Sequence, residues 1–199
     1  GHYINAIAET AKGSDKHVAR IDTGTFNIDG QKKERTHINS LGSGYFATVN
    51  KKAAAKRNYL STAIKQQLVS TGKPPYAHIA LDNGTHFHGQ FAALELLNGQ
   101  YFGNDLRINP QGRIDDGTFE LIGMKSLRPI PFYTDLLSVK RKNGKHLQHE
   151  NVFYARGIKE ALIKWQQPQD VEYDGEVYEG KAWNINVRVD EKKQRIIKP

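Results

Sequence analysis

The chain has 199 residues, a net charge of +8, 38% hydrophobic residues and no cysteine. This length allows a packed core without disulfides, and the missing cysteines exclude a disulfide scaffold, a zinc–thiolate centre and a thiol nucleophile. No apolar run reaches the roughly 18 residues that a transmembrane helix needs, and no signal-peptide pattern opens the chain. The sequence therefore predicts a single cytoplasmic domain over residues 1–199, without a transmembrane segment.

The N-terminal part predicts a short helix, a β-hairpin and a bend. Residues 3–12 have a helical pattern. Residues 17–28 and 35–39 have strand patterns, and between them lies Asp29-Gly30, a dipeptide typical of two-residue hairpin turns. Residues 40–44 include two glycines, so we expect a glycine-rich bend there.

One main helix is predicted over about residues 50–69. Asn50 is a suitable N-cap, and Gly72 with Pro74 ends the helical pattern. Four apolar residues recur on one face, which we expect to be buried. They are Ala53, Leu60, Ile64 and Leu68.

Residues 35–81 carry seven basic residues and no acidic one. Such a local positive charge favours an anionic partner such as a phosphate or an anionic membrane, although a solvated helix face is the alternative. Nucleic acid is not expected as a partner, because no RNA-recognition signature is present and aromatic residues do not interleave with the basic run. The basic residues are Arg35, Lys51, Lys52, Lys56, Arg57, Lys65 and Lys73.

The rest of the chain predicts mostly β-strands. Residues 78–81 and 91–97 flank the hairpin candidate Asp82-Asn83-Gly84, and further strands are expected at residues 119–124 and 152–156. Strict alternation at Trp183, Ile185, Val187 and Val189 predicts a strand with one buried face.

A second, short helix is predicted over residues 132–142, and turn signals recur between the strands. Many short strands with turns at this spacing are typical of a sandwich or open barrel. The predicted fold class is therefore mostly β (α+β), a β-sandwich with one main helix and one short helix.

Two acidic turns are candidates for chemistry. The first is Asp115-Asp116-Gly117, between Arg113 and Thr118, and the second is Asp174-Gly175-Glu176. Carboxylate oxygens are ligands that Mg²⁺ prefers, and a carboxylate can orient a hydroxyl and accept its proton during phosphoryl transfer. Plain hairpin turns are the alternative, because Asp-Gly is a common turn dipeptide.

A metal site is a weaker hypothesis for His86 and His88, whose side chains point to one face of a strand. With Glu95 they suggest a cupin-like metal-dependent enzyme, but an exposed polar strand face is favoured because the spacing to Glu95 is too long. The sequence contains neither a phosphate-binding P-loop motif nor a Gly-x-Ser-x-Gly nucleophile motif.

Four segments in order resemble the C-terminal domain of the diacylglycerol kinase and sphingosine kinase family, especially its soluble bacterial members. The resemblance runs from about Ala19 to the C-terminus. The segments are Ile38-Asn39-Ser40-Leu41-Gly42-Ser43-Gly44-Tyr45-Phe46-Ala47, Asn98-Gly99-Gln100-Tyr101-Phe102-Gly103, Ile108-Asn109-Pro110 with the following 113–117 turn, and Asp174-Gly175-Glu176.

The resemblance implies a set of roles. Asp116 would hold a structural Mg²⁺ through its carboxylate, with the backbone carbonyls of Arg113 and Thr118 as further ligands. Glu176, with Asp174 beside it, would act on the acceptor hydroxyl as general base.

The resemblance also implies the reaction and its partners. ATP would be held by an N-terminal half with a Gly-Gly-Asp-Gly-Thr loop, which this sequence lacks, so the isolated chain is expected to be inactive. The γ-phosphate would pass to a lipid hydroxyl, most simply diacylglycerol to give phosphatidic acid. The basic helix would contact the anionic inner face of the cell membrane. An isolated half with an exposed interdomain face would favour a homodimer.

A non-catalytic binding module is the main alternative. A β-sandwich of this size can bind a carbohydrate or a protein with exposed aromatic side chains. Tyr101, Phe102 and Trp183 are the candidates, and the two acidic segments would then be turns only.

Overall fold

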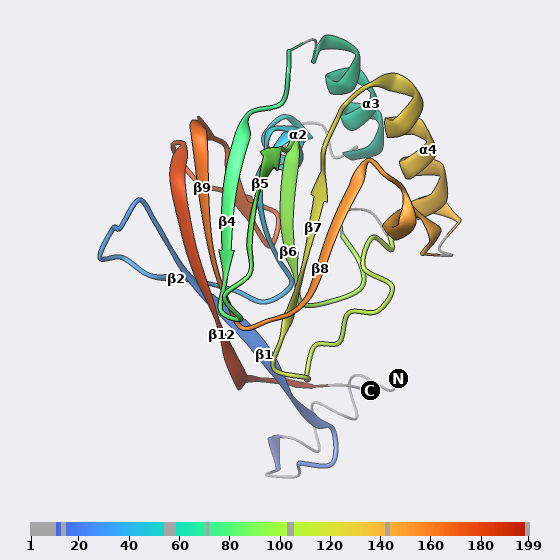
Figure 1. Ribbon diagram of the computed structural model, residues 1–199. Helices are drawn as coiled ribbons and strands as arrows, with labels where there is room; N and C mark the ends of the chain where they lie inside the picture. The colour runs from blue at the N-terminus through green and yellow to red at the C-terminus, as the bar shows by residue number, and fades with distance from the viewer. Residues whose placement is uncertain are drawn as a thin grey trace.

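The computed structural model describes residues 11–12, 15–53, 59–70, 72–102, 106–141 and 144–197. Within these ranges, two antiparallel six-stranded sheets pack face to face, and helices gather on the side of the second sheet (Figure 1). This arrangement confirms the predicted mostly-β, α+β sandwich. The helix predicted at residues 3–12 lies almost wholly outside the described residues.

The first sheet has the strand order β2-β1-β12-β9-β4-β5. Asp29 and Gly30 form a turn with positive φ (51° and 68°) directly after β1, as predicted. The hairpin loop is longer than the two residues expected, because β2 begins only at Arg35, which pairs with Phe26. The strands are β1 (Val18–Ile28), β2 (Arg35–His37), β4 (Tyr76–Leu81), β5 (His86–Gln90), β9 (Glu160–Gln169) and β12 (Ala182–Ile197).

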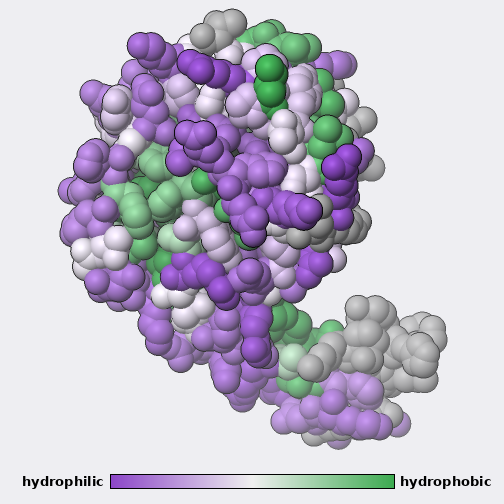
Figure 2. Space-filling model, turned by 45° about the vertical axis from the view of Figure 1, so that its right-hand side comes forward, coloured by the Kyte–Doolittle hydropathy of each residue, from purple (hydrophilic) through white to green (hydrophobic). Residues whose placement is uncertain are grey.

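β1 and β12 form a long antiparallel ribbon, in which Val18 pairs with Ile197 at one end and Ile28 pairs with Ile185 at the other. The outer end of this ribbon projects below the rounded body (Figures 1 and 2). The alternation predicted on β12 is confirmed for Ile185 and Val187, but Trp183 is 50% exposed. The reason is a register shift between Ala182 and Asn184, which places Ala182 on the buried face.

The second sheet has the order β11-β10-β3-β6-β7-β8. The bend predicted at residues 40–44 is wrong, because these residues form a fully buried strand between β10 and β6. Its strands are β3 (Ser40–Gly44), β6 (Ala93–Leu97), β7 (Phe119–Met124), β8 (Val152–Ile158), β10 (Val171–Tyr173) and β11 (Glu176–Val177).

The hairpin partner predicted for residues 78–81 is also corrected. β4 pairs with β5, which follows directly after the Asp82-Asn83-Gly84 turn. The predicted strand 91–97 instead contributes β6, which lies in the other sheet. The chain crosses between the sheets at Phe91 and Ala92, both of which are buried.

The main helix predicted at residues 50–69 is replaced by two helices, α2 (Tyr45–Ala53) and α3 (Tyr59–Val69), with residues 54–58 outside the described part. Asn50 is therefore inside α2 and is not an N-cap. Leu68 was expected on the buried face but is 65% exposed.

The predicted second helix is confirmed with earlier bounds, as α4 (Pro129–Lys140), followed by a short 3-10 helix, η1 (Lys145–Gln148). Pro129 at the first helical position supports this start, since proline is well tolerated there. No helix in the described part of the chain is long and apolar enough to cross a bilayer.

The buried side chains form two layers. One lies between the sheets and includes Phe26, Leu121 and Ile163. The other lies between the second sheet and the helices, and includes Val49 of α2 and Phe132 of α4. The second sheet is thus covered on both faces, and its outer face carries the polar residues described next.

Candidate functional site

The predicted Asp174-Gly175 turn is confirmed as the two-residue turn between β10 and β11. Asp174 and Gly175 have φ of 49° and 85°, and Tyr173 pairs with Glu176. The Asp174 carboxylate accepts three backbone N–H groups at 2.6, 2.7 and 3.0 Å, from Ile38, Asn39 and Ser40. Asp174 therefore fixes the start of β3 against the turn that carries Glu176.

Glu176 has an exposed side chain next to this turn. A pocket of about 460 Å³ adjoins the turn and is lined by polar side chains of β3, α2 and β10. Its lining residues include Asn39, Ser40, Asn50, Phe102, Glu172 and Asp174. Glu176 follows Gly175, the last lining residue of the pocket in sequence, but its own side chain is not part of the lining.

Glu172 is a member of this pocket that the sequence did not single out. It is buried, and its carboxyl accepts hydrogen bonds from Asn50 Nδ2 (2.9 Å), the Gly175 amide (3.1 Å) and Ser40 Oγ (3.4 Å). Burial raises the pKa of this carboxyl, and the donors act in the opposite direction. The signal in the sequence is its position, two residues before Asp174.

The first acidic turn, residues 113–118, is an exposed loop before β7. Asp116 Oδ1 accepts the Thr118 amide (3.2 Å) and Thr118 Oγ1 (3.0 Å), and Arg113 contacts Asp115 at 3.5 Å. No cluster of three acidic or histidine side chains suited to a metal occurs among the described residues. One carboxylate with backbone carbonyls and water is nevertheless an all-oxygen donor set that fits Mg²⁺.

Asp22 anchors this loop, and the sequence analysis missed it. Asp22 is fully buried, its Oδ2 accepts the Gly117 amide and its Oδ1 accepts the Lys192 amide, both at 2.7 Å. The Asp22 amide donates in turn to the Ile114 carbonyl. A register shift in β1 between Ile21 and Thr23 marks the same place.

Asn98 connects the two acidic turns. Its side-chain amide donates to the carbonyls of Asp22 (2.8 Å) and Ile38 (2.9 Å). Ile38 is held by Asp174, and Asp22 holds Gly117. A continuous set of hydrogen bonds therefore joins the segments that carry the family resemblance, although they lie far apart in sequence.

Other predicted candidates do not come together. His86 and His88 are exposed on β5, whereas Glu95 is buried on β6 of the other sheet. The structure thus contradicts a cupin-like site built from these three residues. Phe102, expected as an exposed binding residue, is buried, while Tyr101 is 44% exposed.

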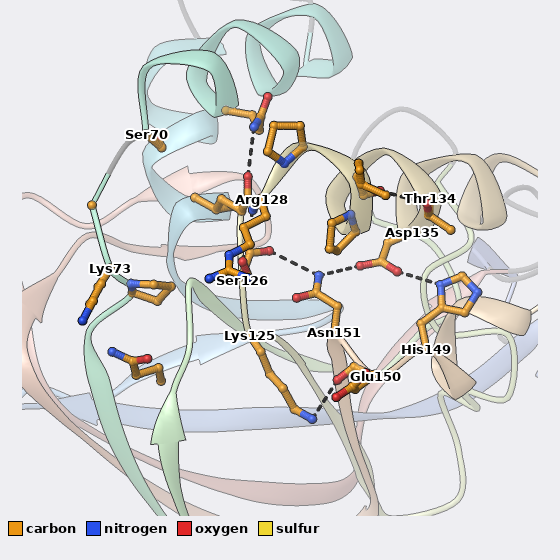
Figure 3. A pocket seen from close by; sticks show the side chains of 18 of the residues that line it. Ser70, Lys73, Lys125, Ser126, Arg128, Thr134, Asp135, His149, Glu150 and Asn151 are labelled. Atoms are coloured by element: carbon orange, nitrogen blue, oxygen red, sulfur yellow. Dashed lines mark hydrogen bonds and ion pairs between the residues drawn. The ribbon is translucent and has the colours of Figure 1, made fainter.

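A larger pocket of about 980 Å³ lies between α3, α4 and the segments 72–74, 125–128 and 149–151 (Figure 3). Lys73, Lys125 and Arg128 are exposed at this pocket. On its other side, Asp135 binds His149 Nδ1 and Asn151 Nδ2, each at 2.7 Å. No local sequence pattern predicts this pocket, because its walls come from segments that are far apart in the chain.

The basic stretch is only partly available for a ligand. Lys51 forms an ion pair with Asp170 at 3.3 Å, and Lys52 donates to Gln66. The side chains of Lys56 and Arg57 lie outside the described residues.

Comparison with known proteins gives a family for the chain. Residues 39–191 match the family model described as the YegS C-terminal NAD kinase beta sandwich-like domain. No match was found among curated proteins.

Three solved structures of proteins from Bacillus anthracis str. Sterne share the fold. Two are described as a "putative diacylglycerol kinase", with 19% and 21% identity and TM-scores of 0.69 and 0.65. The third is described as a diacylglycerol kinase, with 18% identity and a TM-score of 0.61. The matches cover 97–100% of this chain but only 61–62% of those chains.

Proposed function

Because this chain belongs to the YegS C-terminal NAD kinase β-sandwich-like domain family, we propose that it is the acceptor-binding half of a lipid kinase. The whole enzyme would transfer the γ-phosphate of ATP to a lipid hydroxyl, with diacylglycerol as the acceptor and phosphatidic acid as the product. The partial coverage of the similar kinases supports a second half that binds ATP. By itself, residues 1–199 would be inactive.

Glu176 is proposed as the general base, and Asp174 as the residue that positions it. This assignment rests on the three hydrogen bonds that the Asp174 carboxylate accepts from the backbone amides of residues 38–40. These hydrogen bonds fix the Asp174-Gly175 turn beside a polar pocket. A carboxylate on a fixed turn can accept the proton of a hydroxyl while the oxygen attacks the phosphorus atom.

Mg²⁺ is proposed to bind the 113–118 loop through the Asp116 carboxylate and the carbonyls of Arg113 and Thr118. When bound, the ion would supply positive charge that stabilises this loop. Asp22 and Asn98 would transmit the loop position to residues 38–40 through the hydrogen bonds described above.

The lipid is proposed to reach the enzyme from an anionic membrane surface at the cytoplasmic side. Leu68, Val69 and Ile130 are 65%, 67% and 81% exposed at the adjoining ends of α3 and α4. Lys73 and Arg128 are exposed beside them at the larger pocket. Aliphatic side chains flanked by cations suit an anionic bilayer. Pairing of two copies as a homodimer is part of the same proposal.

The test is a phosphoryl-transfer assay with γ-labelled ATP on the protein that includes the upstream ATP-binding half. We expect labelled phosphatidic acid from diacylglycerol, and loss of this product in Asp116→Ala. A reading frame without an upstream Gly-Gly-Asp-Gly-Thr loop would contradict the proposal. So would a wild-type protein that binds a carbohydrate or protein ligand and transfers no phosphate.

A further inference from the structure

Two buried glutamates face each other on the outer face of the second sheet. Gly42 on β3 pairs with Glu95 on β6 and with Glu172 on β10. A Cβ atom at Gly42 would lie 2.0 Å from Glu95 Oε1. The glycine therefore leaves the space in which the two carboxyl groups meet, and a larger residue at position 42 would close it.

Apart from Glu172, Glu95 has no polar partner among the described residues. Its side chain is fully buried, and neither carboxyl oxygen accepts a hydrogen bond from an N–H or O–H group of the described residues. Glu172 is the buried carboxyl on the opposite side of Gly42, and its negative charge contributes to the raised pKa of Glu95. Two ionised carboxylates repel each other, whereas a single shared proton turns the contact into a charge-assisted hydrogen bond.

The proton belongs on Glu95. Glu172 accepts from Asn50, Gly175 and Ser40, and these donors favour its ionised form. Glu95 has no such donors, and burial raises its pKa well above the ordinary carboxyl value. Glu95 is therefore the acid that donates, and Glu172 is the carboxylate that accepts.

Glu172 connects this pair to the turn. The Gly175 amide that it accepts lies between Asp174 and Glu176 in sequence. Asn50 brings α2 to the same carboxyl. The turn is thus held from two sides, by Asp174 on residues 38–40 and by Glu172 on Gly175.

The neighbouring titratable groups do not supply the missing donor. The same face of the sheet carries Glu120 on β7 and Tyr154 on β8, α2 contributes Tyr45, and the turn contributes Asp174. Tyr45 donates to the Ala63 carbonyl. Burial raises the pKa of Tyr154 to about 12 and also raises that of Tyr45, so both stay neutral at physiological pH.

We propose that Glu95 and Glu172 share one proton and act as a positioning pair for the Asp174–Gly175 turn and for Glu176. Glu95 touches no substrate and acts only through Glu172. The link to catalysis rests on the proposed function, whereas proton sharing is a property of this chain by itself.

The first experiment measures the melting temperature of residues 1–199 and of Glu95→Gln as a function of pH. In the wild type, the folded state keeps a proton that the unfolded chain releases above the ordinary carboxyl pKa. Stability therefore falls as pH rises from that value toward the raised folded pKa. Glu95→Gln has no titrating carboxyl at this position and does not show this loss. As pH rises, the melting temperature of Glu95→Gln should therefore increase relative to that of the wild type by about 3 °C per pH unit.

Glu160→Gln is the matched control, since Glu160 is exposed on the other sheet, and its curve should run parallel to that of the wild type. A parallel curve for Glu95→Gln would overturn proton sharing. If Glu95→Gln does not fold, the ¹³C signal of the Glu95 carboxyl in the wild type decides. A protonated carboxyl at pH 7 supports the pair, and an ionised one overturns it.

The second experiment measures turnover in the enzyme that includes both halves. Glu95→Gln keeps a neutral donor toward Glu172 and should retain turnover, whereas Glu95→Ala should lose at least about tenfold in kcat with little change in KM for ATP. Equal losses in both variants would overturn the positioning role. An enzyme without any lipid kinase activity would refute the proposed function and leave the melting result standing.

Discussion

The two faces of the second sheet are both buried but differ in chemistry. The inner face carries Leu94, Leu96 and Leu121 and packs against the first sheet. The outer face, under the helices, carries Glu95, Glu120 and Glu172. Buried acids are expensive for folding, and we propose that their concentration on the outer face serves the function of the domain.

The largest effect on stability is expected on the inner face. Leu121→Ala removes a fully buried side chain between the sheets and should lower the free energy of unfolding by about 2–5 kcal/mol. Turnover per folded molecule in the whole enzyme should stay unchanged. Urea unfolding measures the first quantity. Leu137→Ala is the control, since Leu137 is 54% exposed.

His37 is a titratable side chain that is buried beside the otherwise apolar layer between the sheets. Its ring lies between Phe26 and Phe119, 6.0 and 5.1 Å from their ring centres, and burial lowers its pKa to about 4. As pH falls, His37 takes up a proton at a higher pH in the unfolded chain than in the folded one. The stability that the neutral His37 contributes is therefore fully present above the ordinary histidine pKa and is lost as pH falls toward 4.

The loss should reach up to about 3 kcal/mol between pH 6.5 and 4. Unfolding free energies measured across this range test it. His37→Leu should show a smaller decrease, and an equal decrease in both proteins would assign the acid sensitivity to other groups.

Asp174→Ala tests the outer face. It leaves three amides of residues 38–40 without their carboxylate acceptor, which should lower the free energy of unfolding by about 1–2 kcal/mol, since the site is exposed to water. Turnover should fall far more than stability does. If thermal unfolding and turnover change in proportion, the separation of the two roles is wrong.

The smallest effect is expected at the surface, away from both faces. Glu34 and Arg188 form a two-bond pair, at 2.7 and 3.1 Å, between the β1–β2 connection and β12. Glu34→Gln should leave melting temperature and turnover unchanged within error, because exposed ion pairs contribute little. A clear change that disappears in high salt would show that this pair is an exception.

The sequence predicted features that depend on local chemistry. Asp29-Gly30 and Asp174-Gly175 form turns with positive φ, and residues 119–124 form a strand with the predicted bounds. Local patterns failed where tertiary contacts decide. Residues 40–44 form a strand because they pair with β6 on one side and β10 on the other, and both partners are far away in the sequence.

The candidate site was predictable only in part. Asp174 and Glu176 share a turn signal, but Glu172 and Asp22 accept hydrogen bonds from groups far away in the sequence, the Asn50 side chain and the Gly117 amide respectively. Strand pairing across Gly42 creates the Glu95–Glu172 contact. Such contacts depend on register between strands far apart in the chain, which a single sequence does not reveal.

The most direct test of Glu176 as the general base is the rate of γ-phosphate transfer to diacylglycerol by the Glu176→Gln variant of the enzyme that includes both halves. Glu179→Gln is the matched control, because Glu179 is also an exposed glutamate just beyond β11. We predict a loss of roughly 10²–10⁴-fold in kcat for Glu176→Gln and a near-normal rate for Glu179→Gln. Equal rates for both variants would contradict Glu176 as the base.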